Sequence, residues 1–121
     1  MDHSGLTFRR IGLEEKEQVK EAFLSVFTSD PWYDDWSDRE QLDMYLIDLM
    51  GQNYSLAFGL FESDELVGAS LGYIKHWYTG TEYLIDELFI VKERQGKGIG
   101  TYFLDEISRT IKRWGSNRYF C

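Results

Sequence analysis

The first half of the chain carries two kinds of hydrophobic spacing. Polar and apolar residues alternate from Thr7 to Ile11, which is typical of a short strand. From Leu13 to Phe27 apolar residues return at helical spacing while charged residues occupy the opposite face, so we expect a helix there. The only proline, Pro31, disfavours helix in the residue before it and marks the break. A second helix is expected to start with Ser37 as its N-cap and to end at Gly51.

The second half predicts a hairpin, a third long strand and a further helix. Strands are expected at Tyr54–Phe61 and Leu66–Trp77, joined by a short polar connection, and at Tyr83–Val91. We expect Gly115 to end the last helix and Asn117–Cys121 to begin one more strand. The apolar residues of that helix are spaced to lie along one side, which must pack on the sheet: Ile99, Phe103, Ile107, Ile111 and Trp114.

Length and composition set the class of protein. The 121 residues, of which 43% are hydrophobic and 17% aromatic, predict a single domain over residues 1–121 with one packed core. The polar N-terminus and the lack of an apolar run near the ~18 residues that span a bilayer predict a cytoplasmic protein with no signal peptide or membrane segment. The net charge of −8 argues against a nucleic-acid or membrane partner.

The most informative stretch is Ile85–Gly100, where an apolar strand runs into a glycine-rich turn that opens a helix. Glycines let successive N–H groups converge, and the positive end of the helix dipole favours an anion, so this arrangement can hold phosphate. Two carboxylates, Asp86 and Glu87, precede the turn on the same strand. No window has the spacing of a Walker loop, and the third glycine comes one residue too early for a dinucleotide fingerprint. A turn that merely joins strand to helix is the alternative.

The remaining pattern, Gln95-Gly96-Lys97-Gly98-Ile99-Gly100, fits the Q/R-x-x-G-x-G/A signature of the GNAT superfamily of N-acetyltransferases. The chain resembles that superfamily over essentially its whole length. The resemblance implies an α/β (α+β) fold with a mixed central sheet flanked by helices. This chain would hold the fold as far as the third main helix and the start of the fifth strand.

The resemblance also implies an acetyl-coenzyme A (acetyl-CoA) site. The pyrophosphate would sit on the loop amides, and the pantetheine arm would hydrogen-bond along the preceding strand. A backbone N–H near Phe89 to Val91, where the family has a β-bulge, would donate to the oxyanion. The residues expected to bind this cosubstrate are Leu88, Phe89, Ile90, Val91, Gln95, Gly96, Lys97, Gly98, Ile99, Gly100 and Thr101.

Two carboxylates are the candidates for proton transfer. In the family an amine attacks the thioester directly, so a base must first take a proton from the amine. Asp86 is favoured, because Ile85-Asp86-Glu87-Leu88 resembles the I-D-Q/E-L/F segment of aminoglycoside 6'-N-acetyltransferases, in which the aspartate is the proposed base. Glu87 is the reserve. Adjacent strand residues point to opposite faces, so we expect one of the two to face the acceptor. A carboxylate satisfied by its neighbours is the alternative.

An aromatic and acidic loop follows the first predicted helix. Aromatic faces and carboxylates together suit a polyamine or an aminosugar, although a surface loop anchored by its tryptophans is the alternative. His76 ends a hairpin strand and could act as a base near neutral pH, whereas a hydrogen-bonded histidine is the alternative. The two histidines and the terminal cysteine lack the spacing of a metal site, so we expect none. The residues expected to bind the acceptor are Trp32, Tyr33, Asp35, Trp36 and His76.

These features predict an N-acetyltransferase that acts on a primary amine of a small cationic acceptor in a ternary complex. A non-catalytic acyl-CoA-binding or regulatory module is the first alternative, and a protein lysine or N-terminal acetyltransferase is the second. The family usually adds a fourth helix, which often carries a tyrosine as general acid, and two further strands. A sheet without them should expose an apolar face and an open edge, so we expect self-association, for example as a homodimer.

Overall fold

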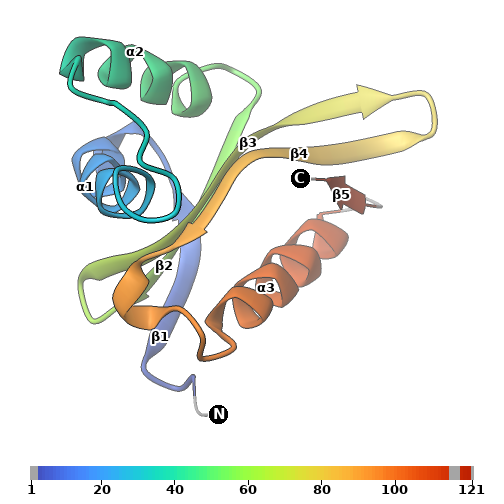
Figure 1. Ribbon diagram of the computed structural model, residues 1–121. Coiled ribbons are helices and arrows are strands. Elements are labelled where there is room, and N and C mark those ends of the chain that lie inside the picture. The colour runs from blue at the N-terminus through green and yellow to red at the C-terminus, as the bar shows by residue number, and fades with distance from the viewer. Residues whose placement is uncertain (1–2, 115–117, 121) are drawn as a thin grey trace.

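The described residues, 3–114 and 118–120, contain five strands that form one mixed sheet (Figure 1). Their order is β1-β2-β3-β4-β5; the first four run antiparallel to their neighbours, and β5 runs parallel to β4. This computed structural model confirms the expected mixed sheet with flanking helices. In chain order the elements are β1 (Leu6–Ile11), the short 3-10 turn η1 (Leu13–Glu15), α1 (Lys16–Phe27), α2 (Arg39–Met50), β2 (Ser55–Glu62), β3 (Glu65–Trp77), β4 (Gly80–Ile90), the 3-10 turn η2 (Lys92–Arg94), α3 (Ile99–Arg113) and β5 (Arg118–Phe120).

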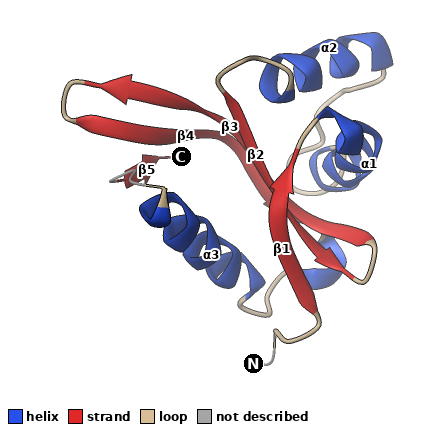
Figure 2. Cartoon of the chain, turned by 180° about the vertical axis from the view of Figure 1, so that it is seen from behind, coloured by secondary structure: helices blue, strands red, loops and turns tan. Residues whose placement is uncertain are grey.

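Helices cover both faces of the sheet. α1 and α2 lie on one face and α3 lies on the other (Figures 1 and 2). On the first face the ring of Phe23 from α1 lies 5.9 Å from that of Phe89 in β4. On the second face Phe103 from α3 lies 5.9 Å from Phe8 in β1. The apolar stripe of each helix is therefore buried against alternate residues of the strands, which is the main source of stability in such a layered fold.

Beyond these layers β3 and β4 continue as a two-stranded arm, residues 75–81, that projects away from the helices (Figure 1). At its tip Trp77 is 50% exposed and Tyr78 is 88% exposed. The strand predicted to start at Tyr83 thus starts at Gly80, because it pairs with the whole outer end of β3.

Two predicted helix starts are wrong by a few residues. The first helical segment opens as the separate turn η1, where the Glu15 side chain accepts a hydrogen bond from the Gly12 N–H at 2.7 Å. α2 has Asp38 rather than Ser37 as its N-cap, and the Asp38 side chain accepts a hydrogen bond from the Gln41 N–H at 3.1 Å. A carboxylate is the stronger acceptor at this position, since its charge also favours the positive end of the helix dipole.

The last elements follow the prediction as far as they are described. α3 has Trp114 as its C-cap. The predicted further strand is present as β5, which pairs with Glu82–Leu84 of β4. The predicted helix stop at Gly115 and the strand ends at Asn117 and Cys121 lie outside the described residues.

The pairing of β3 with β4 is irregular at Asp86, and this irregularity determines the geometry of the candidate site. Leu71 of β3 pairs with Glu87, and the next residue, Gly72, pairs with Ile85, so Asp86 is an extra residue that bulges from β4. A Cβ on Gly72 would collide with the carbonyl oxygen of Leu84, so only glycine permits this close approach. The predicted position of the bulge, near Phe89 to Val91, is therefore wrong, because β4 keeps a regular register with β3 from Glu87 to Ile90.

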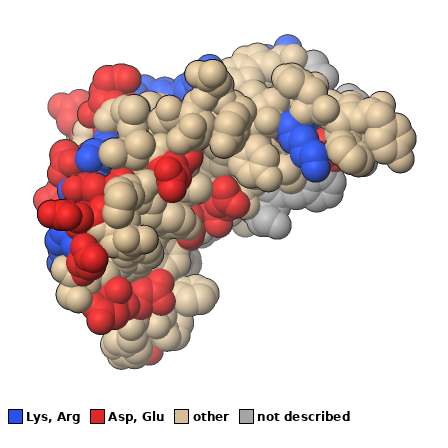
Figure 3. All heavy atoms as spheres, turned by 90° about the horizontal axis from the view of Figure 1, so that it is seen from above, with Lys and Arg blue, Asp and Glu red and all other residues tan. Residues whose placement is uncertain are grey.

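Acidic side chains gather over the half of the molecule that carries α1 and α2 (Figure 3). The projecting arm carries one charged side chain, Lys75, whose Nζ lies 4.4 Å from the centroid of the Trp77 ring. No helix in the described ranges is long and apolar enough to cross a membrane.

Candidate active site

The bulge turns both carboxylates of β4 toward α2. Asp86 lines a cleft together with Asp48 and Leu49 of α2, while the carboxylate of Glu87 accepts a hydrogen bond from the hydroxyl of Tyr45, also on α2. The expectation that these adjacent residues point to opposite faces is therefore wrong. Strand alternation fails here because an inserted residue shifts the alternation by one position.

Glu87 and Tyr45 form a half-buried polar pair between β4 and α2. Burial raises the pKa of Glu87, the Tyr45 hydrogen bond lowers it, and the negative charges of Asp86 and Asp34 raise it, with a net increase. Burial, followed by the bond to Glu87, likewise raises the pKa of Tyr45 well above its usual value. Tyr45 therefore remains protonated and acts as the hydrogen-bond donor.

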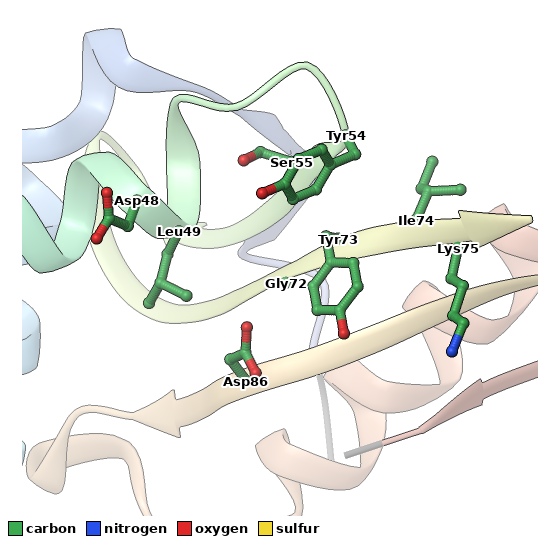
Figure 4. A pocket seen from close by; sticks show the side chains of 9 residues that line it. All are labelled: Asp48, Leu49, Tyr54, Ser55, Gly72, Tyr73, Ile74, Lys75 and Asp86. Carbon is green, nitrogen blue, oxygen red and sulfur yellow. The ribbon is translucent and has the colours of Figure 1, made fainter.

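Asp86 opens into a cleft of about 580 Å³ between α2 and strands β2, β3 and β4. In Figure 4 its carboxylate and the ring of Tyr73 point into the space below Leu49. The ring of Tyr54 meets Tyr73 edge to face, with centroids 5.7 Å apart. The cleft thus has a carboxylate beside aromatic walls, which suits an amine on a body with apolar faces. Its lining residues are Asp48, Leu49, Tyr54, Ser55, Gly72, Tyr73, Ile74, Lys75 and Asp86.

Sequence reasoning named Asp86 but missed the rest of this lining. Tyr73 and Lys75 sit two residues apart on β3, so strand alternation could have put them on one face. Nothing local in the sequence signals Asp48 or Tyr54, because their place in the cleft depends on how α2 packs across the sheet.

The five predicted acceptor residues do not line this cleft. Trp36 packs face to face on Tyr45, with ring centroids 5.5 Å apart, and Tyr45 in turn donates its hydroxyl to Glu87. Trp32 and Tyr33 are 58% and 68% exposed. The alternative reading of an anchored surface loop fits Trp36 better than direct acceptor contact does.

The other two predicted acceptor residues are engaged locally. Asp35 accepts a hydrogen bond from the Ser37 N–H at 3.0 Å, and bonding to Ser37 lowers the pKa of Asp35. His76 lies on the arm, where its Nδ1 is 3.0 Å from Oγ1 of Thr81. This is the hydrogen-bonded strand-end histidine that the sequence left as an alternative to a base.

The glycine loop has the geometry of an anion cradle. Gly96 and Gly98 have φ angles of 77° and 74°, which favour glycine, and Gly98 is the N-cap of α3. A Cβ at Gly96, Gly98 or Gly100 would meet nothing within 4 Å, so the space above the loop is open. The first helical bond runs from the Tyr102 N–H to the Gly98 carbonyl, which leaves the three N–H groups ahead of it, those of residues 99–101, without a partner inside the helix.

Polar contacts hold this loop against the sheet. The Gln95 side chain donates to the Ile90 carbonyl at 2.7 Å, and the Gln95 N–H donates to the Lys92 carbonyl at 3.2 Å. Lys97 in the loop is exposed. The loop is thus tied to the end of β4 and presents N–H groups and one positive charge to an anion.

The predicted pantetheine strand has one open edge. β5 pairs with β4 only at Glu82–Leu84, and beyond the bulge no strand among the described residues pairs with the far edge of β4. Phe89 and Val91 bury their side chains, whereas Leu88 and Ile90 are half-buried. Backbone groups along that edge are therefore the ones a ligand could meet. Among the residues that the structure describes, no group of histidine, cysteine and carboxylate side chains is arranged to hold a metal ion.

Comparisons with known proteins agree with this geometry. The model of the acetyltransferase (GNAT) family matches residues 17–121. A search of curated proteins gives no match. An aminoglycoside acetyltransferase from an uncultured soil metagenomic sample, in complex with trehalose, is 20% identical with a TM-score of 0.72, over 98% of this chain and 77% of that chain.

Two further solved structures share the fold. The ribosomal-protein-alanine N-acetyltransferase of Brucella melitensis biovar Abortus 2308 is 14% identical with a TM-score of 0.72, over 95% of this chain and 77% of that one. AAC(6')-Iy, in complex with the bisubstrate analogue CoA-S-monomethyl-acetylneamine, is 13% identical with a TM-score of 0.67, over 96% and 78%. These likenesses show the fold, and the family model covers β4, the glycine loop and α3 alike. The chain belongs to the GNAT family of acetyltransferases.

Proposed function

We propose that this chain transfers the acetyl group of acetyl-CoA to a primary amine of a small cationic acceptor, an aminosugar or a polyamine, by direct attack in a ternary complex. The observation that carries the proposal is the position of the glycine loop at the end of the strand whose bulge turns Asp86 into a cleft. Acetyl-CoA, bound along the edge of β4, and the acceptor, bound in the cleft at Asp86, would then both contact β4.

The loop residues Gln95 to Thr101 would hold the pyrophosphate, and the open edge of Leu88 to Val91 would hold the pantetheine arm. Acetyl-CoA supplies an activated acetyl thioester when bound. Asp86 would take the proton from the acceptor ammonium, with Glu87 as the other carboxylate within the bulge. Backbone N–H groups of β4 would stabilise the developing negative charge on oxygen.

The proposed class of acceptor, a small cationic amine, is inferred from the charged and aromatic side chains that line the cleft. Asp48 and Asp86 give the cleft two carboxylates, Lys75 gives it one positive charge, and Tyr54 and Tyr73 offer aromatic faces. A cationic amine gains from both features. Two of the structural neighbours described above are named as acetyltransferases of aminoglycosides or carry an acetylneamine analogue, which supports the aminosugar branch.

Two alternatives remain part of the proposal. A protein-modifying acetyltransferase is favoured by the likeness to the ribosomal-protein-alanine enzyme. A non-catalytic acyl-CoA-binding module would use the loop and strand edge without the cleft. We further propose that the chain self-associates, because the aromatic tip of the arm and the open edge of β4 are exposed.

Release of free coenzyme A with a panel of aminoglycosides, polyamines and peptides separates these functions. Turnover with the first two classes supports the proposal, turnover with peptides alone supports the protein-modifying alternative, and thermal stabilisation by acetyl-CoA without turnover supports the binding module. Asp86→Asn should lower kcat/KM by roughly 100-fold, as loss of a general base does. Asp105→Asn, on the exposed side of α3, is the matched control. Full activity of Asp86→Asn across pH would remove Asp86 as the base.

A further inference from the structure

The bulge creates a conflict between two carboxylates. Asp86 and Glu87 follow each other and share one face of the sheet, and the negative charge of Asp86 raises the pKa of Glu87. Only Asp86 lines the cleft. Glu87 instead accepts a hydrogen bond from the hydroxyl of Tyr45 on α2, which lies 42 residues earlier in the chain. The contact therefore ties Glu87 to α2, while Asp86 lines the cleft.

The Tyr45 side chain is itself held in place. Trp36 stacks on its ring at 5.5 Å with an interplanar angle of 19°, and Phe23 meets the ring edge to face at 6.1 Å. Phe23 in turn packs on Phe89 of β4, at 5.9 Å. Rings on both sides restrict the rotamers of Tyr45, so its hydroxyl is aimed at Glu87 at little further entropic cost.

We propose that Tyr45 is a positioning residue that divides the two carboxylates of the bulge, tying Glu87 to α2 and leaving Asp86 alone to receive the acceptor amine. This inference rests on the proposed function for its effect on turnover. The contact geometry between α2 and β4 carries the division itself. Trp36, which was expected to touch the acceptor, acts instead by holding Tyr45 in place.

Three groups face the Glu87 carboxylate. They are Tyr45 from α2, Asp86 from the same strand and Asp34 from the loop that joins α1 to α2. Burial and the two carboxylates raise the pKa of Glu87, and the Tyr45 bond alone opposes them. Loss of the hydroxyl therefore removes the one contribution that favours the charged form, and the pKa of Glu87 must rise further.

The first test follows Glu87 directly. The protein, labelled with carbon-13 at its glutamate carboxyls, is titrated by NMR without any ligand, and Glu87→Gln assigns the signal. In Tyr45→Phe the pKa of Glu87 should move up, whereas Tyr78→Phe, which removes a hydroxyl from the exposed tip of the arm, should leave it in place. An unchanged or lower pKa of Glu87 in Tyr45→Phe overturns the proposal, provided that thermal unfolding shows the variant to be folded.

The second test follows turnover. Tyr45→Phe should lower kcat/KM by roughly tenfold, the loss expected for a hydrogen bond to a charged group. It should also move the acidic limb of the pH profile to lower pH, because a more protonated Glu87 places less negative charge beside Asp86. In a Glu87→Gln background the same substitution should no longer move that limb, because the second carboxylate is gone. A limb that stays in place in Tyr45→Phe, or that moves equally in both backgrounds, overturns the proposal. If the unaltered chain shows no turnover, the proposed function fails, and the NMR titration still decides the role of Tyr45.

Discussion

Arg94 and Glu62 join the turn η2 to the end of β2. The guanidinium Nε donates to the Glu62 carboxylate at 3.0 Å, and an NH2 group of Arg94 contacts the same oxygen. The bond to Glu62 also raises the pKa of Arg94. This arginine is thus committed to the sheet although it lies directly before the glycine loop, and the exposed cation within the loop is Lys97.

Replacing Lys97 should therefore weaken coenzyme A binding. Lys97→Ala removes an exposed charge beside the expected pyrophosphate, worth about 1 kcal/mol or about a fivefold loss in affinity. Because the charge is exposed, the loss should shrink at high salt. Titration calorimetry at two salt concentrations measures both effects. Lys112→Ala, at the opposite end of α3, is the matched control, and equal affinities for the two variants would contradict the assigned role of Lys97.

Substitution of two loop glycines by alanine should change the stability of the fold in opposite directions while weakening coenzyme A binding in both cases. Gly98 has a φ of 74°, so Gly98→Ala should cost roughly 1–2 kcal/mol of folding free energy. Gly100 lies in the first turn of α3 without a positive φ, so Gly100→Ala should stabilise the fold by about 0.4–1 kcal/mol. Both added methyl groups project into the open space where phosphate is expected, so both variants should bind coenzyme A more weakly. Urea unfolding and calorimetry together check this, and undiminished affinity in Gly100→Ala would place the phosphate elsewhere.

Features carried by a short stretch of chain could be predicted from the sequence. The strands, the helices and the glycine turn each leave a periodic or compositional signal over a few neighbouring residues. The mixed sheet was inferred from the family resemblance, and β5 was expected from a segment of only five residues. All of these are present in the fold.

Features that depend on two distant segments could not be predicted. The bulge at Asp86 exists because Gly72, on the neighbouring strand, permits a close backbone approach. The contact from Tyr45 to Glu87 and the placing of Asp48 in the cleft depend on how α2 lies across the sheet. Strand alternation predicts opposite faces for Asp86 and Glu87, but alternation holds only for an unbroken strand. The roles of these residues in cofactor and acceptor binding stay predictions.

Glu87 should make the stability of the fold depend on pH. Its folded pKa is raised above the usual value of 4.5, mainly by burial, so its contribution to stability is fully present below that value and is lost as pH rises through the folded pKa. Glu87→Gln keeps an acceptor for Tyr45 but carries no charge. This variant should therefore become more stable relative to the unaltered chain as pH rises from about 4 toward neutrality.

Urea unfolding at several pH values measures this difference. Glu40→Gln, at an exposed position on the same helix as Tyr45, controls for the loss of one carboxylate. A constant difference between Glu87→Gln and the unaltered chain at every pH would show that burial does not disfavour the charge of Glu87.

The arm should mediate the proposed self-association. Trp77 and Tyr78 expose large aromatic surfaces at its tip, in a region with few charges (Figure 3), and water-exposed aromatic groups gain most from burial against a second copy. Replacing both by serine should shift the chain toward a monomer in light scattering across a dilution series. Met44→Ser, at another exposed apolar position, on α2, is the control, since it lies away from the arm. A dilution-resistant monomer in the unaltered chain would contradict self-association itself. Oligomers that persist in the double variant would move the interface away from the arm, with the open edge of β4 as the next surface to alter.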